Sequence, residues 1–110
     1  MQTGVETRTY LAIANKLFSE EERADIVALV AADPECGDVI RGTGGFRKVR
    51  AARKEMGKRG GARVVDIWRS ERSPVFLITV FPKNEKENLS MAERNELRKR
   101  ADSIFETYGR

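Results

Sequence analysis

Basic side chains concentrated in one segment are the residues of this sequence best suited to chemistry. The chain of 110 residues holds 21 Lys and Arg and 17 Asp and Glu. Nine of the basic residues lie between Arg41 and Arg63, where Glu55 is the only acidic one, so this segment carries +8 and the remainder −4. A segment dominated by one sign is typical of a surface that binds a polyanion, whereas a solvated charged face usually mixes signs. Nucleic acid is therefore the expected partner.

The same segment is suited to holding phosphate groups. Arg binds a phosphate through two parallel N–H donors, and Lys binds it as a point charge. A strand, a glycine-hinged loop and a second strand would bring these side chains around one concavity. Lys83, just beyond an apolar stretch, is placed to join them.

Two absences limit the chemistry. The chain has no histidine, which excludes serine–histidine and cysteine–histidine nucleophiles and removes the commonest metal ligand. Its single cysteine, Cys36, excludes an internal disulfide and a zinc cluster, and we expect no reactive role for it. The glycines match neither a phosphate-binding loop nor a dinucleotide fingerprint. Catalysis must rest on Lys, Arg, Asp, Glu, Tyr, Ser or Thr, and no cofactor or metal is expected.

The chain is expected to form one domain, 1–110, of α+β architecture, which positions the basic residues. Serine followed three residues later by glutamate forms the capping-box pattern, which marks helix starts at Ser19 and Ser90. Asp33-Pro34 stops the helix that Ser19 begins, because proline forces its predecessor out of helical geometry. The expected helices are Thr7–Phe18, a second between Ser19 and Asp33, and a last one from Ser90 through Tyr108.

A small antiparallel sheet is expected between the helices. The expected strands are Gln2–Glu6, Phe46–Ala51, Arg63–Arg69 and Val75–Phe81. The last of these is apolar apart from one threonine, which indicates a central strand covered on both faces. Gly42–Gly45 is expected to form a turn with positive φ angles, and Gly57–Gly61 a mobile basic loop. Core packing is the favoured role of Tyr10, Trp68, Phe81 and Tyr108.

The apolar stretches Ile26–Ala32 and Val75–Phe81 are much shorter than the roughly 20 residues that cross a membrane. The first six residues lack the basic start and apolar stretch of a secretion signal. A cytoplasmic location with no membrane partner is expected.

Three stretches of the chain carry a family likeness. They are Gly37–Arg50, with Gly-Thr-Gly-Gly-x-Arg-Lys-x-Arg, Gly57–Val65, with Gly-Lys-x-Gly-Gly-x-Arg, and Leu77–Glu85. In this order and spacing they resemble the RelE/ParE superfamily, with the HigB-like branch of type II toxins closest. The resemblance implies a RelE-like fold and a ribosome-dependent endoribonuclease that cuts mRNA in the A site. It also implies a cognate antitoxin, HigA-like with a helix-turn-helix, as partner beside the ribosome and mRNA.

The family's chemistry is attack of a ribose 2′-hydroxyl on the adjacent phosphate, giving a cyclic phosphate and a free 5′-hydroxyl. The resemblance implies that Arg63 and Lys83 stabilise the negative charge that develops on that phosphate. Lys54 or Lys58, with a pKa lowered by neighbouring cations, is the candidate base. The side chains expected to grip RNA are Arg47, Lys48, Arg50, Lys58 and Arg59, with Phe81 as a stacking residue.

Many relatives carry tyrosine where this chain has Phe81, which stacks but transfers no proton. Two alternatives to mRNA cleavage stay open, and only the second depends on Phe81. One is a ParE-like inhibitor of DNA gyrase, and the other is an RNA-binding module derived from a toxin that has lost its activity.

Overall fold

The computed structural model describes residues 2–53, 57–83 and 88–108, with the backbone alone for residues 53, 57–60 and 108. After one short opening strand come two helices, then the remaining strands, and a helix ends the described part of the chain. They are β1 (Gly4–Glu6), α1 (Arg8–Leu17), α2 (Glu20–Ala32), β2 (Asp38–Val39), β3 (Phe46–Arg53), β4 (Gly57–Ile67), β5 (Val75–Pro82) and α3 (Met91–Tyr108). None of the helices in these ranges is long and apolar enough to cross a membrane.

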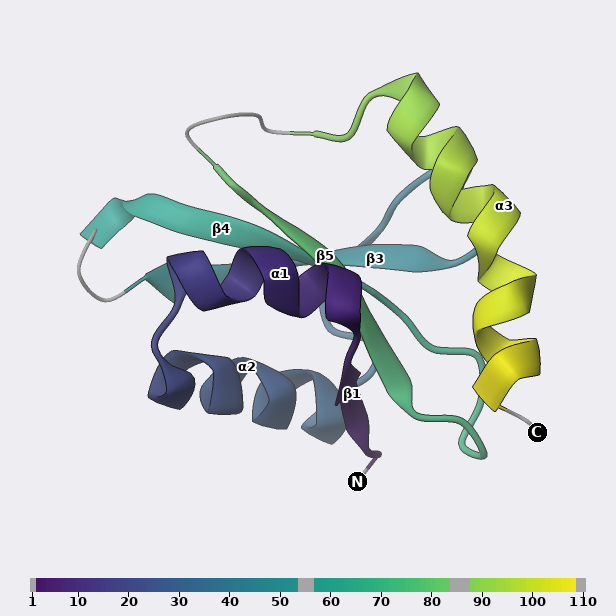
Figure 1. The fold of residues 1–110 in the computed structure, drawn as a ribbon, viewed down its shortest axis with the longest axis horizontal. Coiled ribbons are helices and arrows are strands. Elements are labelled where there is room, and N and C mark those ends of the chain that lie inside the picture. Colours follow the sequence, from purple (N-terminus) through teal and green to yellow (C-terminus); the bar gives the residue numbers. More distant parts are fainter. Residues whose placement is uncertain (1, 54–56, 84–87, 109–110) are drawn as a thin grey trace.

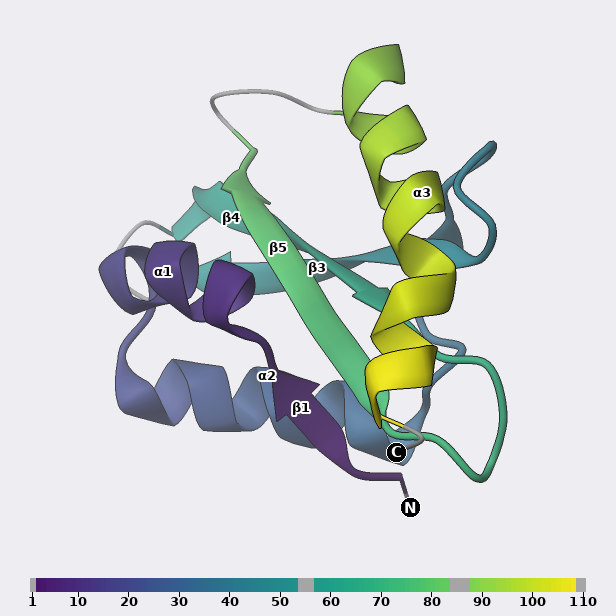
Figure 2. The same ribbon diagram turned by 45° about the vertical axis from the view of Figure 1, so that its right-hand side comes forward.

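The sheet has five strands in the order β1-β5-β4-β3-β2. β2, β3, β4 and β5 pair antiparallel, while β1 pairs parallel with β5, so the sheet is mostly rather than wholly antiparallel. Figures 1 and 2 show α1 and α2 on one side of this sheet and α3 on the other. The expected α+β architecture, with two N-terminal helices and a C-terminal helix, is confirmed.

Each face of the sheet has its own apolar core. On one face, Tyr10 of α1 and Val30 of α2 pack against strand residues such as Val64 and Leu77. On the other, Leu97 of α3 packs against residues that include Val65 and Ile67. β5 contributes to both cores, which confirms the expected strand covered on both faces.

The predicted capping boxes begin two of the helices. Ser19 Oγ accepts from the Glu22 backbone N–H at 3.1 Å, and Glu22 Oε1 accepts from the Ser19 backbone N–H at 2.8 Å. Ser90 and Glu93 exchange the equivalent bonds at 3.1 and 2.9 Å. These contacts satisfy backbone donors that the first turn of a helix leaves unpaired, which is why both starts were readable from the sequence.

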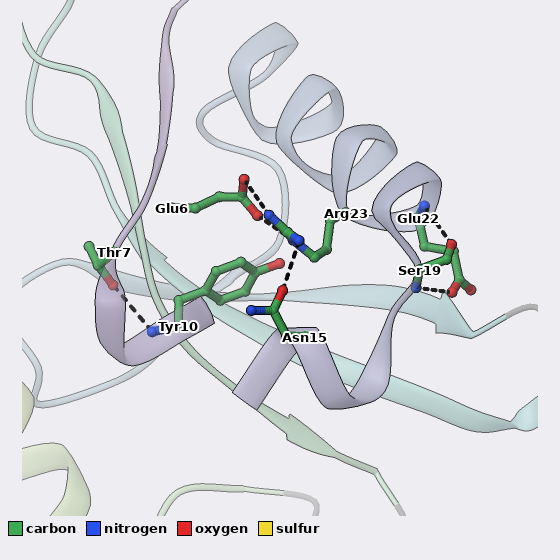
Figure 3. A network of polar contacts seen from close by, with 7 residues as sticks. All are labelled: Glu6, Thr7, Tyr10, Asn15, Ser19, Glu22 and Arg23. Atoms are coloured by element: carbon green, nitrogen blue, oxygen red, sulfur yellow. Dashed lines mark hydrogen bonds and ion pairs between the residues drawn. The ribbon is translucent and has the colours of Figure 1, made fainter. Parts of the chain in front are cut away.

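A polar network ties the N-terminal elements together. Arg23 of α2 donates to both carboxylate oxygens of Glu6 at the end of β1, at 3.0 and 3.3 Å, and to Asn15 Oδ1 of α1 at 2.8 Å (Figure 3). Thr7 Oγ donates to the Leu77 carbonyl at 2.7 Å and accepts from the Tyr10 N–H, which caps α1 onto the sheet. The network holds α1 and α2 on the face of the sheet opposite α3.

Strand content differs from the expectation in two segments, and the other ends of the expected strands shift by one or two residues where they differ. Gly57–Gly61, expected as a mobile loop, belongs to β4, so that prediction is wrong; Gly57 pairs with Arg53 of β3 across a register shift. β2 was not expected, because a two-residue strand has no detectable periodicity. The expected turn at Gly42–Gly45 is confirmed, with φ of +81°, +80° and +117° at Gly42, Gly44 and Gly45. The cause of the first error is that strand pairing with β3 outweighs the low strand preference of glycine.

Candidate functional site

Strand alternation places four cations on the face of the sheet that α3 partly covers. In β3, Val49 and Ala51 point into the core under α1 and α2, so Lys48 and Arg50 point to the other face. Arg63 lies between the inward residues Ala62 and Val64 of β4 and is paired directly with Arg50. Lys83 follows β5, and its backbone N–H donates to the Gly61 carbonyl at 2.9 Å.

These cations surround one cleft. It has a volume of about 320 Å³, and its described lining residues are Asp38, Lys48, Arg50, Arg63, Lys83 and Asn88. Lys48 Nζ donates to Asn88 Oδ1 at 2.6 Å, which joins β3 to the segment just before α3. Residues from β2, β3, β4, the end of β5 and the segment before α3 therefore line one cleft. The candidates from the sequence that it brings together are Lys48, Arg50, Arg63 and Lys83.

The charge in the cleft is not neutralised within the described ranges. No carboxylate there lies within ion-pair distance of the four cations, although Asp38 lines the same cleft. Arg50 of β3 and Arg63 of β4 lie directly opposite each other on neighbouring strands. Such like-charged pairs destabilise a sheet by about 0.2–1 kcal/mol. An arrangement that costs stability and concentrates positive charge is suited to binding an anion of high charge density, such as a phosphodiester.

Arg47 lies apart from this cleft, on the opposite face of β3. It donates to the carbonyls of Glu35 and Gly37 at 3.1 and 3.3 Å, and the Glu35 carboxylate lies 3.9 Å away. The sequence grouped it with Lys48 as an RNA-gripping residue, but adjacent residues of a strand point to opposite faces. The structure therefore does not bring Arg47 to the cleft, and gives it a role in holding the segment before β2 against β3.

Phe81 is paired with Arg63 and faces the same side of the sheet, but it is only 4% exposed. It belongs to the core under α3 and lines the floor of a second hollow beside the cleft. The structure thus places it as a packing residue, in agreement with the favoured interpretation, and leaves little of its ring free to stack on a base.

Three further candidates have no described side chain. Lys54 lies outside the described residues, and Lys58 and Arg59 are described by their backbone in β4 alone. Their roles stay predictions from the sequence and the family resemblance.

Sequence reasoning missed two residues of the cleft, Asp38 and Asn88. Asp38 lies on β2, a strand that was not expected, and its Cα is paired with that of Lys48. Asn88 precedes the cap of α3 by two residues, so the capping pattern locates its backbone but gives no signal of its side-chain role. Only the packing of α3 against the sheet brings Asn88 beside Lys48.

One buried carboxylate lies on the other side of β4. Asp66 is fully buried, no described residue hydrogen bonds either oxygen, and burial raises its pKa to about 7, opposed in part by the charge of Arg47. The Cys36 thiol also has a raised pKa, first because it is partly buried and then because Asp66 is near. Asp66 belongs to the Arg47 face and plays no part in the cleft.

The chain is similar to a known protein family and to solved structures. Residues 37–109 match the family described as the RelE toxin of the RelE/RelB toxin–antitoxin system. Among solved structures, the chain is similar to a double mutant of the E. coli toxin RelE in the free state, with a TM-score of 0.56 and 21% identity over 79% of this chain and 90% of that chain. At this identity the structural likeness is one of fold. The matched residues 37–109 include the whole described lining of the cleft.

Proposed function

This chain belongs to the RelE toxin family, and we propose that it is a ribosome-dependent endoribonuclease that cleaves mRNA in the A site. The observation that carries the proposal is the cleft in which Lys48, Arg50, Arg63 and Lys83 converge, with no described carboxylate within ion-pair distance of them. Its positive charge and its volume of about 320 Å³ fit one phosphodiester group.

The proposed reaction needs no group from outside the chain and its substrate. The ribose 2′-oxygen forms a bond to the adjacent phosphorus, and the bond from phosphorus to the 5′-oxygen breaks. The 2′-hydroxyl proton passes to a base, for which Lys54 and Lys58 are the candidates. The leaving 5′-oxygen takes a proton from a lysine ammonium of the chain, so the number of protons on the protein is unchanged. The products are a cyclic phosphate and a free 5′-hydroxyl.

Arg63 and Lys83 are assigned to the transition state. The phosphorus passes through a state with additional negative charge on its equatorial oxygens, and fixed cations stabilise that charge more than they stabilise the substrate. Arg63 is held in place by strand pairing on both sides, and the backbone of Lys83 is anchored to Gly61. Lys48 and Arg50 would hold the neighbouring phosphates.

Family membership implies a cognate antitoxin. We propose that it is HigA-like with a helix-turn-helix, and that the toxin acts in the cytoplasm, where ribosomes and mRNA are found. Co-expression of this partner is expected to relieve the growth arrest that the chain causes alone.

The proposal is tested with purified protein, translating ribosomes and a defined mRNA, by primer extension and analysis of the new ends. Arg63→Ala and Lys83→Ala are each expected to slow cleavage by about 10²–10³-fold, which is the typical effect of removing one preorganised charge-stabilising group. Arg72→Ala and Arg98→Ala remove the same charge from exposed positions outside the cleft and are expected to leave the rate unchanged.

Two results would contradict the proposal. If Arg63→Ala and Lys83→Ala cleave as fast as the wild type, the cleft is not the catalytic site. If the message stays intact while DNA supercoiling by gyrase fails, the chain acts as a ParE-like inhibitor instead.

A further inference from the structure

A second hollow adjoins the basic cleft and has no role in the proposed cleavage chemistry. Its volume is about 310 Å³, and it shares Lys48 and Asn88 with the cleft. The hydrogen bond between these two side chains therefore forms a wall common to both. An RNA whose phosphate lies in the cleft would present the base of an adjacent nucleotide to this hollow.

The hollow combines an apolar floor with a cationic rim. Ile40, Phe81 and Leu89 form the floor and are 5%, 4% and 8% exposed. Val39 also lines the hollow and is 57% exposed, and among the described residues the other large apolar side chains exposed to solvent are Leu29 and Met91. The basic residues that line it are Arg41, on the segment after β2, and Arg94, whose Nε donates to the Leu89 carbonyl at 3.3 Å.

These properties match those of a base-binding site. Single-stranded RNA is read by apolar or aromatic surfaces and guanidinium planes on which an unstacked base lies, with polar groups at its edge. The volume corresponds to about ten water molecules, which is enough for one base. We infer that this hollow binds the nucleobase of a nucleotide next to the scissile phosphate.

The polar groups of the hollow also select the class of base. Lys48 is only a donor, so it fixes the amide of Asn88 with Oδ1 toward Nζ and leaves the Nδ2 hydrogens as donors. Arg41 and Arg94 likewise only donate. Guanine and uracil present a keto oxygen at the edge where adenine and cytosine present an amino donor. The hollow therefore favours keto bases over amino bases.

This inference rests on the proposed function, since the cleavage reaction supplies the RNA, but it is tested without cleavage. The probes are 2′-O-methyl dinucleotides that carry one base and one abasic sugar, in both orders, and that lack the attacking hydroxyl. Dissociation constants and the chemical shifts of the Val39 methyl groups are measured with the purified chain. The wild type is expected to bind guanine and uracil probes about tenfold more tightly than adenine and cytosine probes, with Val39 shifts.

Two variants and one control sharpen the test. Asn88→Asp replaces the Nδ2 donor with an acceptor and is expected to reverse the base preference. Arg41 is exposed, so the Arg41→Ala variant is expected to fold like the wild type. This variant is expected to bind the keto-base probes several-fold more weakly. Arg98→Ala removes a charge on α3 outside both hollows and is expected to change neither quantity.

The outcomes separate the two proposals. Equal affinity for all four bases, or Val39 methyl groups that do not shift, would overturn the base site, even if ribosomal cleavage is intact. If the ribosome-bound message is not cleaved, but keto-base probes bind more tightly and shift the Val39 methyl signals, the proposed function is refuted and the base site is supported.

Discussion

Replacing Asp66 with asparagine is expected to remove most of a strong pH dependence from the folding stability. Asp66 of β4 is fully buried and is paired with Arg47 of β3, and no described residue hydrogen bonds its oxygens. Burial raises its pKa from an ordinary 3.8 to about 7, and the charge of Arg47 offsets only part of that rise. The folded state therefore holds the proton of this carboxyl at pH values where the unfolded chain has lost it.

The sign and size of the effect follow from linkage. Below about pH 4 the carboxyl is protonated in both states and costs nothing, and above about pH 7 the fold must bear a buried charge. Each pKa unit is worth about 1.4 kcal/mol, so the full penalty is about 4 kcal/mol, of which about 3 kcal/mol develops between pH 5 and pH 8. That is a large share of the 5–15 kcal/mol typical of a domain.

The assay is urea unfolding of the wild type and Asp66→Asn at pH 5 and pH 8. The wild type is expected to lose about 3 kcal/mol more than the variant over this interval. Asp25→Asn, which removes an exposed carboxylate of α2, is the control and is expected to follow the wild type. Parallel stability curves for the wild type and Asp66→Asn would refute the reasoning, because they would mean that Asp66 is ionised in the fold at no cost.

Three further predictions concern the scaffold of the cleft. Arg50→Gln is expected to raise the free energy of unfolding by about 0.2–1 kcal/mol, because it removes the repulsion from Arg63. The same variant is expected to bind RNA more weakly, with an affinity that depends less on salt concentration. Lower stability, or an RNA affinity with unchanged salt dependence, would contradict this. Gly37→Ala is expected to lower the free energy of unfolding, measured with urea, by about 1–3 kcal/mol. The reason is that φ at this position is +88° and the new Cβ would lie 2.5 Å from the Lys48 carbonyl oxygen. An unchanged free energy of unfolding would show that β2 is not fixed against β3. Ser90→Ala is expected to cost about 1 kcal/mol through loss of the α3 cap, and a melting temperature equal to that of the wild type would exclude that role.

Local patterns in the sequence were sufficient for the helices and for much of the sheet. Capping boxes at Ser19 and Ser90 concern residues three apart, and the apolar run of β5 indicates burial on both faces; neither depends on the rest of the chain. Strand content was underestimated at Gly57–Gly61, because pairing with β3 decides that segment and pairing is a long-range contact.

For the site, the sequence alone determined which cations were available and that phosphate was their expected ligand, since charge and residue type are independent of folding. The tertiary structure decided which of them act together. The pleat separates Arg47 from Lys48, and strand register sets Arg50 against Arg63. The packing of α3 brings Asn88 to Lys48 across forty positions of the chain, which no local pattern specifies. Composition fixes what chemistry is possible, but the direction of each side chain depends on strand pairing and packing between segments far apart in the sequence.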